Sequence, residues 1–370
     1  MGRLAGESSM PLPLGQRESS GLVLMSIKDN LEKEKSDKER AEGLLRIANL
    51  GRGAKELRAT VRALTSELED VRRELALSIG SDGLEKIHIP PGRFSKKGEV
   101  VPVLLFSDHH IEELVPLNQT NGRNEYSPEI AKARFEKLLY NSVKLIKHEA
   151  SRSKIDKIVV WLGGDFMSGH IHADLVEITD TAPLETALIV HERLRSGLEF
   201  IAEETKAEQV FVPTSYGNHG RITQGRPRIA TAAAHNIEHM IYRTLARELS
   251  GDSRFVFDVQ PTRLKILDVG GFKIRFSHGD DIRYAGGTGG FHAPLVNQIR
   301  RWNAETPVDL DCMGHYHTFV YLPGLAVMNG SLIGASEYSR RFGFEVPRQV
   351  LFYIDIERKE QAGTYPVWVD

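Results

Sequence analysis

Cysteine is almost absent from this sequence, and so are long apolar runs. The one cysteine, Cys312, rules out a disulfide within the chain and fits a reducing compartment. No run approaches the roughly 18 apolar residues that a membrane-spanning helix needs. The apolar stretch 21–25 near the start is too short for the core of a signal peptide. We therefore expect a cytoplasmic protein without a membrane segment.

An excess of charge of one sign is also missing. The net charge of −2 gives the chain as a whole no electrostatic footprint for nucleic acid. The glycine-rich stretch 286–290 lacks the lysine of a phosphate-binding P-loop, so it does not predict a nucleotide site. With 370 residues and 41% hydrophobic content, the chain is long enough for a sizeable core and for more than one domain.

What the sequence does contain is a series of polar motifs, each placed where an apolar run ends. In chain order they are Asp108-His109-His110, Gly164-Asp165, Gly217-Asn218-His219, Ser277-His278-Gly279 and Gly314-His315-Tyr316-His317. A single histidine is usually an ordinary packed or surface residue. A whole series at successive strand ends is hard to explain by packing, because strands disfavour Asp and Asn. Carboxylate, amide and imidazole groups together make a ligand set for two adjacent divalent ions, which is typical of phosphate-ester hydrolysis.

The order and residue types of these motifs resemble those of the calcineurin-like metallophosphoesterases, over about residues 101–355. The resemblance implies one metal ion on Asp108, His110 and His317, and a second on Asn218, His278 and His315. Asp165 would bridge the two ions, and His219 would face the substrate as the catalytic acid. From the resemblance we expect Mn. Fe or Zn are alternatives, because mixed nitrogen and oxygen ligands without cysteine suit these metals.

One position departs from the family pattern. The family usually places Asp or Glu after the Asn-His pair, and Gly220 stands there. That acid normally orients and polarises the catalytic histidine. Either another carboxylate replaces it, or His219 is a weaker acid catalyst.

Ahead of the motifs, composition separates an arm and a linker from the rest. Residues 1–25 are expected to be disordered or tag-like, and 26–79 to form a helical arm. Apolar residues in the arm are spaced 4, 3, 4, 3 and 4 apart, at Leu57, Val61, Leu64, Leu68, Val71 and Leu75. This seam predicts a coiled coil over 55–77 and hence a homo-oligomer. Packing of the same stripe on the catalytic domain is the alternative. Residues 80–92 are expected to be a linker, and 93–370 the catalytic domain.

From residue 101 onward, apolar runs alternate with amphipathic stretches. Strands are expected at 101–106, 158–162, 210–212, 310–313, 326–328 and 350–356, and a hairpin through Gly270-Gly271 at 264–269 and 272–276. A helix is expected to begin at Pro128 with Ser127 as its N-cap, and further helices to cover 184–204 and 230–249. These elements predict an α/β (α+β) fold, a two-sheet sandwich flanked by helices, with the site in loops at strand ends.

Arginines close to the motifs bear on the substrate. Arg221, Arg226 and Arg228 follow His219, and Arg283 follows His278. Such local enrichment suits a polyanion in the cleft, although any one of them can equally be a solvated loop residue. The leading hypothesis is a DNA nuclease resembling the SbcD-type repair exonuclease subunits. The alternative is a phosphomonoesterase or a phosphodiesterase of small molecules such as cyclic nucleotides. A non-catalytic metal-bound scaffold is the third hypothesis.

Overall fold

The computed structural model describes most of the chain from residue 98 onward. The exceptions are 172, 180, 224, 226–231, 284–289, 291 and 337–345; before residue 98 it describes 35, 38–40, 42, 59–61, 63, 64, 67, 88 and 89. The chain divides into two units, Met1–Glu85 and Lys86–Asp370. The described residues of the first unit are helical, and Val61 and Leu64 are exposed. The tag-like segment 1–25 and the rest of the predicted heptad seam lie outside the described residues. The predicted domain boundaries stay a prediction.

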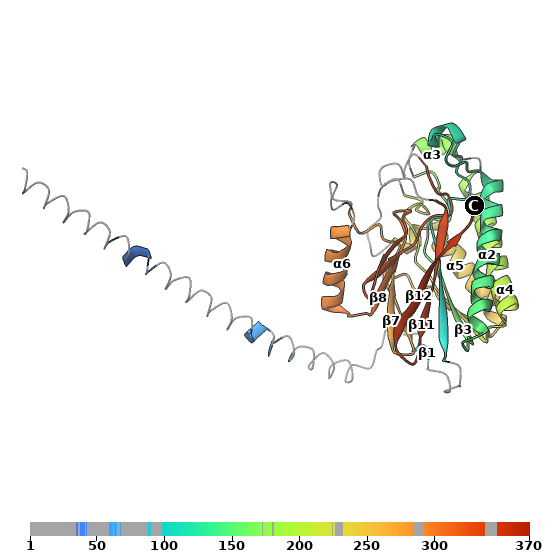
Figure 1. Cartoon of the computed structure of the whole chain (residues 1–370). Coiled ribbons are helices and arrows are strands. Elements are labelled where there is room, and N and C mark those ends of the chain that lie inside the picture. The colour runs from blue at the N-terminus through green and yellow to red at the C-terminus, as the bar shows by residue number, and fades with distance from the viewer. Residues whose placement is uncertain are drawn as a thin grey trace, which may run out of the picture. The chain divides into compact units, whose positions relative to one another are not determined.

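Two six-stranded sheets form the centre of the second unit (Figure 1). The first, called here the β2 sheet, has the order β12 (Glu360–Trp368), β11 (Arg348–Asp355), β2 (Val100–Phe106), β3 (Lys157–Leu162), β4 (Gln209–Pro213) and β5 (Phe255–Asp258). The second, the β7 sheet, has the order β1 (His88–Ile89), β6 (Lys265–Val269), β7 (Phe272–Phe276), β8 (Leu310–Met313), β10 (Ala326–Met328) and β9 (Val320–Leu322). Strands β2 to β5 are parallel, as are β7, β8 and β10.

Helices cover the outer face of each sheet. They are α2 (Pro128–Ala150), α3 (Ala173–Ile178), α4 (Pro183–Thr205), α5 (Ile237–Glu248) and α6 (His292–Glu305), with 3-10 turns η1 (Leu117–Thr120), η3 (Ala233–His235) and η4 (Leu249–Gly251). Helices α2, α4 and α5 lie on one side of the paired sheets and α6 on the other (Figure 1). Side chains such as Leu138, Leu198 and Leu245 pack on the β2 sheet, whereas Leu295 and Ile299 of α6 belong to a cluster with the β7 sheet. The predicted fold class, two sheets flanked by helices, is thus confirmed.

The core between the sheets is apolar. Trp161 of β3 stacks on Phe276 of β7 with the ring centroids 5.7 Å apart, and both side chains are buried. Cys312 of β8 is buried in the same cluster, and burial raises the pKa of its thiol well above the usual range. This cysteine is therefore a small core residue. Among the described residues, no helix is long and apolar enough to cross a membrane.

Most expected elements occur where the sequence placed them. The side chain of Ser127 accepts a hydrogen bond from the Ile130 amide, so it caps α2 as predicted. Gly270 and Gly271 both have positive φ angles, 63° and 93°, as the predicted hairpin turn requires. The helix expected from residue 230 begins instead at Ile237. Asn236 is extended (φ −131°, ψ 124°), and its side chain accepts hydrogen bonds from the first amides of α5.

Several elements were missed. Residues 88 and 89, expected in the linker, form β1 beside β6, and the strands β5, β9 and β12 were not expected either. Strand β12 is at the edge of its sheet, where partly exposed side chains and Pro366 interrupt the usual apolar pattern. Helix α6 was missed because it buries only two side chains, Leu295 and Ile299, fully. Helix α3, with six residues, is too short for a helical period to be recognised.

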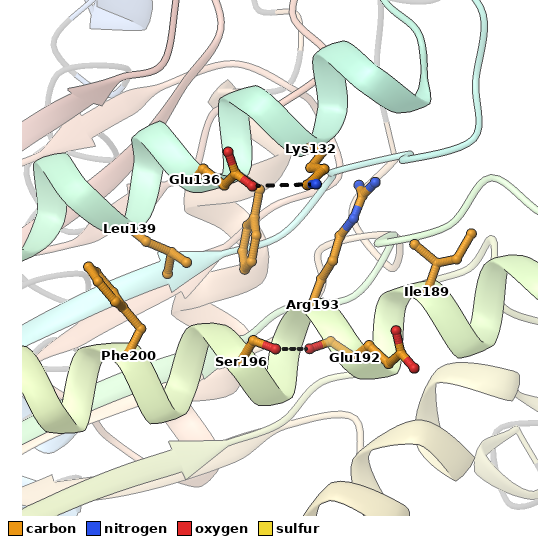
Figure 2. Close-up of a pocket in the computed structure, with 9 residues that line it drawn as sticks. Lys132, Glu136, Leu139, Ile189, Glu192, Arg193, Ser196 and Phe200 are labelled. Atoms are coloured by element: carbon orange, nitrogen blue, oxygen red, sulfur yellow. Dashed lines mark hydrogen bonds and ion pairs between the residues drawn. The ribbon is translucent and has the colours of Figure 1, made fainter.

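Helices α2 and α4 lie side by side and enclose a hollow of about 530 Å³ between them (Figure 2). Its floor is apolar, with Leu139 of α2 and Phe200 of α4 among the lining residues. Its rim carries charges of both signs, including Lys132, Glu136 and Arg193. None of the lining residues belongs to the motifs of the predicted metal site, so this hollow is separate from that chemistry.

Candidate metal centre

All five motifs lie at the carboxyl ends of strands that the fold brings together. Asp108 follows β2, Asp165 follows β3 and Asn218 follows β4, whereas His278 follows β7 and His315 follows β8. Because β2, β3 and β4 are parallel, their carboxyl ends share one edge of the β2 sheet, and the same holds for β7 and β8. The two edges meet, since Asp165 Oδ2 lies 2.8 Å from His278 Nε2 across the sheets. The predicted site residues therefore converge although they come from both sheets.

Asp108, His110 and His317 form one group that could hold a metal ion. Their ligand atoms all lie within 4.8 Å of one another, and all three residues are buried. The two Nε2 atoms of His110 and His317 are 3.1 Å apart, and His317 Nε2 is 3.5 Å from Asp108 Oδ1. Ligand atoms bound about 2.1 Å from one cation are separated by distances of this order. The set matches the first ion site that the resemblance implied.

Asp165, His278 and His315 form a second such group, also within 4.8 Å. The side-chain oxygen of Asn218 is buried and has no hydrogen-bond partner among the described residues. A buried carbonyl oxygen without a partner costs about 1–3 kcal/mol, so it normally has a function or a bound group. The donor set of two imidazoles, a carboxylate and an amide oxygen fits a transition-metal ion. The grouping places Asp165 with the second set, and its bridging role stays a prediction.

The backbone at these residues is unusual. Asp108, His110, Asp165, His315 and His317 all have φ angles between 49° and 72°, in the left-handed region that residues with a Cβ rarely adopt. Each such residue costs on the order of 1–3 kcal/mol unless the surroundings hold it in place. Strain of this kind clusters at functional sites. Its presence at five of the seven predicted ligands supports a functional role for the cluster.

Two glycines allow the loops to approach this closely. A Cβ atom at Gly217 would overlap the carboxylate oxygen Oδ1 of Asp165, and one at Gly314 would overlap Oδ2 of Asp108. Any larger residue would push a predicted ligand out of place. The glycines in the Gly-Asn-His and Gly-His-Tyr-His motifs are therefore required by space.

Hydrogen bonds set the tautomers of two histidines. His278 Nδ1 donates to the carbonyl of Gly163 over 2.7 Å, so Nε2 is the ring atom that offers a lone pair to the centre once it has lost its proton. His110 Nδ1 lies 2.8 Å from the hydroxyl of Ser168, and that hydroxyl donates its own proton to Glu113. His110 must then be the donor to Ser168, and its Nε2 also offers a lone pair. Metal-bound histidines usually have such partners on the second ring nitrogen.

Burial and neighbouring charges shift the ionisation of the cluster. Burial lowers the pKa of His315 to about 4 and that of His317 to about 3, so both are neutral at pH 7, as ligation requires. Burial opposes the charged form of His278 most strongly, but the charge and hydrogen bond of Asp165 together with the charges of Asp108 and Asp280 outweigh it and raise the pKa to about 10. Burial raises the pKa of Asp108 to about 7. The metal-free cluster thus keeps protons that a divalent cation would displace.

His219 lies beside the cluster and is half-buried. Its amide donates to Asp165 Oδ1 over 2.8 Å, and its ring nitrogen Nδ1 donates to the backbone carbonyl of Ser168, also over 2.8 Å. The backbone carbonyl therefore takes the position that an acid after the histidine would fill. Among the described residues the partner of Nδ1 is thus a carbonyl and not a replacement carboxylate, and the alternative, that His219 is a weaker acid catalyst, stays a prediction.

The space at Gly220 is occupied by the start of α5. A Cβ atom there would lie 2.7 Å from Asn236 Oδ1 and 2.8 Å from Glu238 Cγ. Glu238 accepts hydrogen bonds from the amides of Phe166 and Gly217, over 2.7 and 2.8 Å, and Asn236 donates to the carbonyl of Gly217 over 2.8 Å. Burial, followed by the charge of Asp165, raises the pKa of Glu238 to about 7. The two residues hold the Asp165 and Asn218 loops together.

The sequence did not lead us to expect that Glu112, Glu113 and Glu238 support the site. Glu112 accepts the amides of Ser168 and Gly169, and Glu113 accepts the Ser168 hydroxyl, so both acids fix the loop that orients His110 and His219. Glu112 and Glu113 follow the first motif after one residue, and this pair of acids was a signal that the sequence offered. Glu238 gave no such signal, because it looks like an ordinary acid in the first turn of a helix.

Of the four arginines predicted to bind the substrate, the structure describes Arg221 and Arg283. Arg221 donates to the backbone carbonyl of Asn218 over 2.9 Å, so it supports the loop of a predicted ligand. Arg283 is exposed. Arg226 and Arg228 lie outside the described residues.

Comparison with known proteins assigns no family to the chain. No family model matches the chain, and no curated protein matches it. A solved structure of a single mutant of Vps29 from Entamoeba histolytica is similar, with 13% sequence identity and a TM-score of 0.29. The similarity covers 72% of this chain and 98% of that one. The fold itself is established by the two helix-flanked sheets, which bring His and Asp groups together at their joined edge.

Proposed function

We propose that this protein is a dinuclear metal-dependent phosphoesterase that hydrolyses phosphodiester bonds in nucleic acid, with DNA as the expected substrate. The observation that carries the proposal is the convergence of two largely buried ligand groups from four strand ends. The Asn218 side-chain oxygen at the same place has no partner among the described residues. Seven side chains of ligand type, five of them on left-handed backbone, are hard to explain as packing.

In this proposal the two groups hold one divalent ion each. Asp108, His110 and His317 supply the first site, and Asn218, His278 and His315 the second. Asp165 would serve both ions, because its carboxylate offers two anionic oxygens. Mn is the proposed metal, with Fe or Zn as alternatives. Two such metal ions would supply a nucleophilic hydroxide at neutral pH and would neutralise charge on the phosphoryl oxygens.

The chain itself supplies a proton donor in His219. Because Nδ1 is engaged with the Ser168 carbonyl, Nε2 is the ring nitrogen that faces the substrate and delivers a proton to the leaving oxygen. His219 is therefore proposed as an oriented proton donor.

The test begins with the ions. Chelator should abolish activity and Mn should restore it, and Asp165→Asn or His315→Ala should remove at least one ion as measured by elemental analysis. Full activity of metal-free protein, or two retained ions in Asp165→Asn, would refute the site. If the protein holds both ions but hydrolyses no phosphoester, it is a metal-bound scaffold.

The substrate class is then tested on one panel. Mn-loaded protein is assayed on linear and circular DNA, single-stranded DNA, RNA, cyclic nucleotides and p-nitrophenyl phosphate. Cleavage of DNA in preference to the small esters supports the nuclease. Turnover of cyclic nucleotides or of the phosphomonoester, with polynucleotides left intact, would overturn it in favour of a small-molecule phosphoesterase.

A further inference from the structure

Helix α5 borders a groove next to the proposed metal centre. The groove has a volume of about 620 Å³, and its lining includes Ile222, from the segment after His219, and several residues of α5. Hydrogen bonds connect the start of α5 to the loop that carries the predicted ligand Asn218. The side chain of Asn236, which lines the groove, donates to the carbonyl of Gly217, and the Ile237 amide donates to the carbonyl of Gly220 over 2.8 Å. A molecule in the groove would therefore contact Asn236, whose side chain bonds to Gly217, the residue before Asn218.

The α5 side of the groove is basic. Asn236, Met240, Arg243 and Arg247 all line it and are spaced 4, 3 and 4 residues apart, so they form one stripe along the helix. Arg243 and Arg247 lie one turn apart, about 6 Å along the axis. Both are exposed, and neither forms an ion pair with another residue in the described part of the chain. No Asp or Glu is among the lining residues that the structure describes, so the stripe favours an anion.

The groove also offers apolar contacts. Ile222 and Met240, two of its lining residues, are 66% and 55% exposed. The imidazole of His239 lines the same surface. An apolar pair beside two arginines suits a ligand that alternates phosphates with flat, largely apolar rings. A duplex keeps its bases stacked inside and would leave the apolar pair without a partner.

We propose that the α5 groove binds a single-stranded segment of the nucleic-acid substrate, with its phosphates on Arg243 and Arg247 and its bases against Ile222 and Met240. This inference rests on the proposed function and adds a strand-binding subsite to it. The groove would lead the strand along α5 into the loop that carries Asn218 and His219.

The test reverses the two charges in Arg243→Glu/Arg247→Glu. The matched control is Arg300→Glu/Arg301→Glu, which makes the same charge change at exposed positions of α6, on the far side of the paired sheets (Figure 1). Binding of a labelled oligodeoxythymidine is measured at several salt concentrations. The α5 variant should lower the affinity and flatten the log–log salt slope by about 1.4, or about 0.7 for each lost phosphate contact. The control should keep both values.

Kinetics separate the groove from the metal centre. With single-stranded DNA as substrate, the α5 variant should raise KM and change kcat little, because the chemistry takes place elsewhere. An unchanged slope and KM in the α5 variant, or an equal loss in the α6 control, would overturn the strand-binding subsite. If the wild-type protein cleaves only small phosphoesters, the nucleic-acid part of the proposed function has failed instead, whatever the variants do.

Discussion

The backbone carbonyl of Ser168 accepts a hydrogen bond from His219 Nδ1 over 2.8 Å, and the hydroxyl of the same residue lies 2.8 Å from His110 Nδ1. One residue thereby orients both the proposed acid catalyst and a proposed ligand, through different atoms. The two functions can be separated, because a change of the side chain removes only the hydroxyl.

Ser168→Ala should weaken metal binding and spare the catalyst. The variant keeps the carbonyl that orients His219 but leaves His110 Nδ1 without its partner. Loss of such a supporting hydrogen bond typically lowers metal affinity by about 10–100-fold. Titration of metal-free protein with Mn measures the affinity, and excess Mn should restore most of the activity. A normal metal affinity with a persistent loss of turnover would contradict the assignment of this hydroxyl to His110.

His219→Gln should do the reverse of Ser168→Ala: it should lower turnover and leave metal binding unchanged. Because His219 is in neither ligand group, the variant should keep both ions and its substrate affinity. Loss of a general acid typically lowers turnover by about 10²–10⁴-fold. Elemental analysis and steady-state kinetics on the same preparation test this. A fall in metal content along with activity would mean that His219 is a ligand.

Metal binding should release protons and strengthen with pH. His278, with its pKa raised to about 10 in the metal-free cluster, must lose a proton from Nε2 before that atom can bind a cation. The apparent affinity should therefore rise about tenfold per pH unit above pH 7 and level off near pH 10. Below pH 7 the dependence should be steeper, because Asp108, with a pKa of about 7, must also be ionised. Calorimetric titrations with Mn in buffers of different ionisation enthalpy count the protons. A pH-independent affinity would show that His278 is already neutral.

Much of the fold could be predicted because buried strands have a simple signature. Strand β2 is buried along its whole length and reads as an unbroken apolar run, and the motif after it marks its end. The left-handed backbone at Asp108 or His315 has no such signature, since nothing local favours it and the surrounding hydrogen bonds impose it. The contacts of Glu238 with the two loops could not be predicted from the sequence either. Its carboxylate reaches two loops only after α5 has packed on the β2 sheet.

The arm provides a prediction independent of the metal centre. We propose that the apolar seam over 55–77 joins copies of the chain; two of its residues, Val61 and Leu64, are 54% and 57% exposed. Replacing Leu64, Leu68 and Val71 by polar residues should lower the mass in light scattering, because a coiled coil depends on its apolar positions. Circular dichroism and activity should show that the catalytic unit stays folded. An unchanged mass would mean that the seam packs within one chain or does not pair.

Gly220→Asp would restore the acid that the resemblance leads one to expect, and we predict that it impairs the protein. The new Cβ would lie within 3 Å of Asn236 and Glu238. Neither can move away easily, because both side chains hold Gly217 through hydrogen bonds. Overpacking of this kind typically costs about 1–3 kcal/mol, and a carboxylate beside Glu238 adds repulsion. Urea unfolding should show the loss of stability, and Gly220→Ala should show the part that is due to the clash alone. Higher turnover in Gly220→Asp would mean that the Ser168 carbonyl is a poor substitute for the acid and that the α5 start yields to admit one.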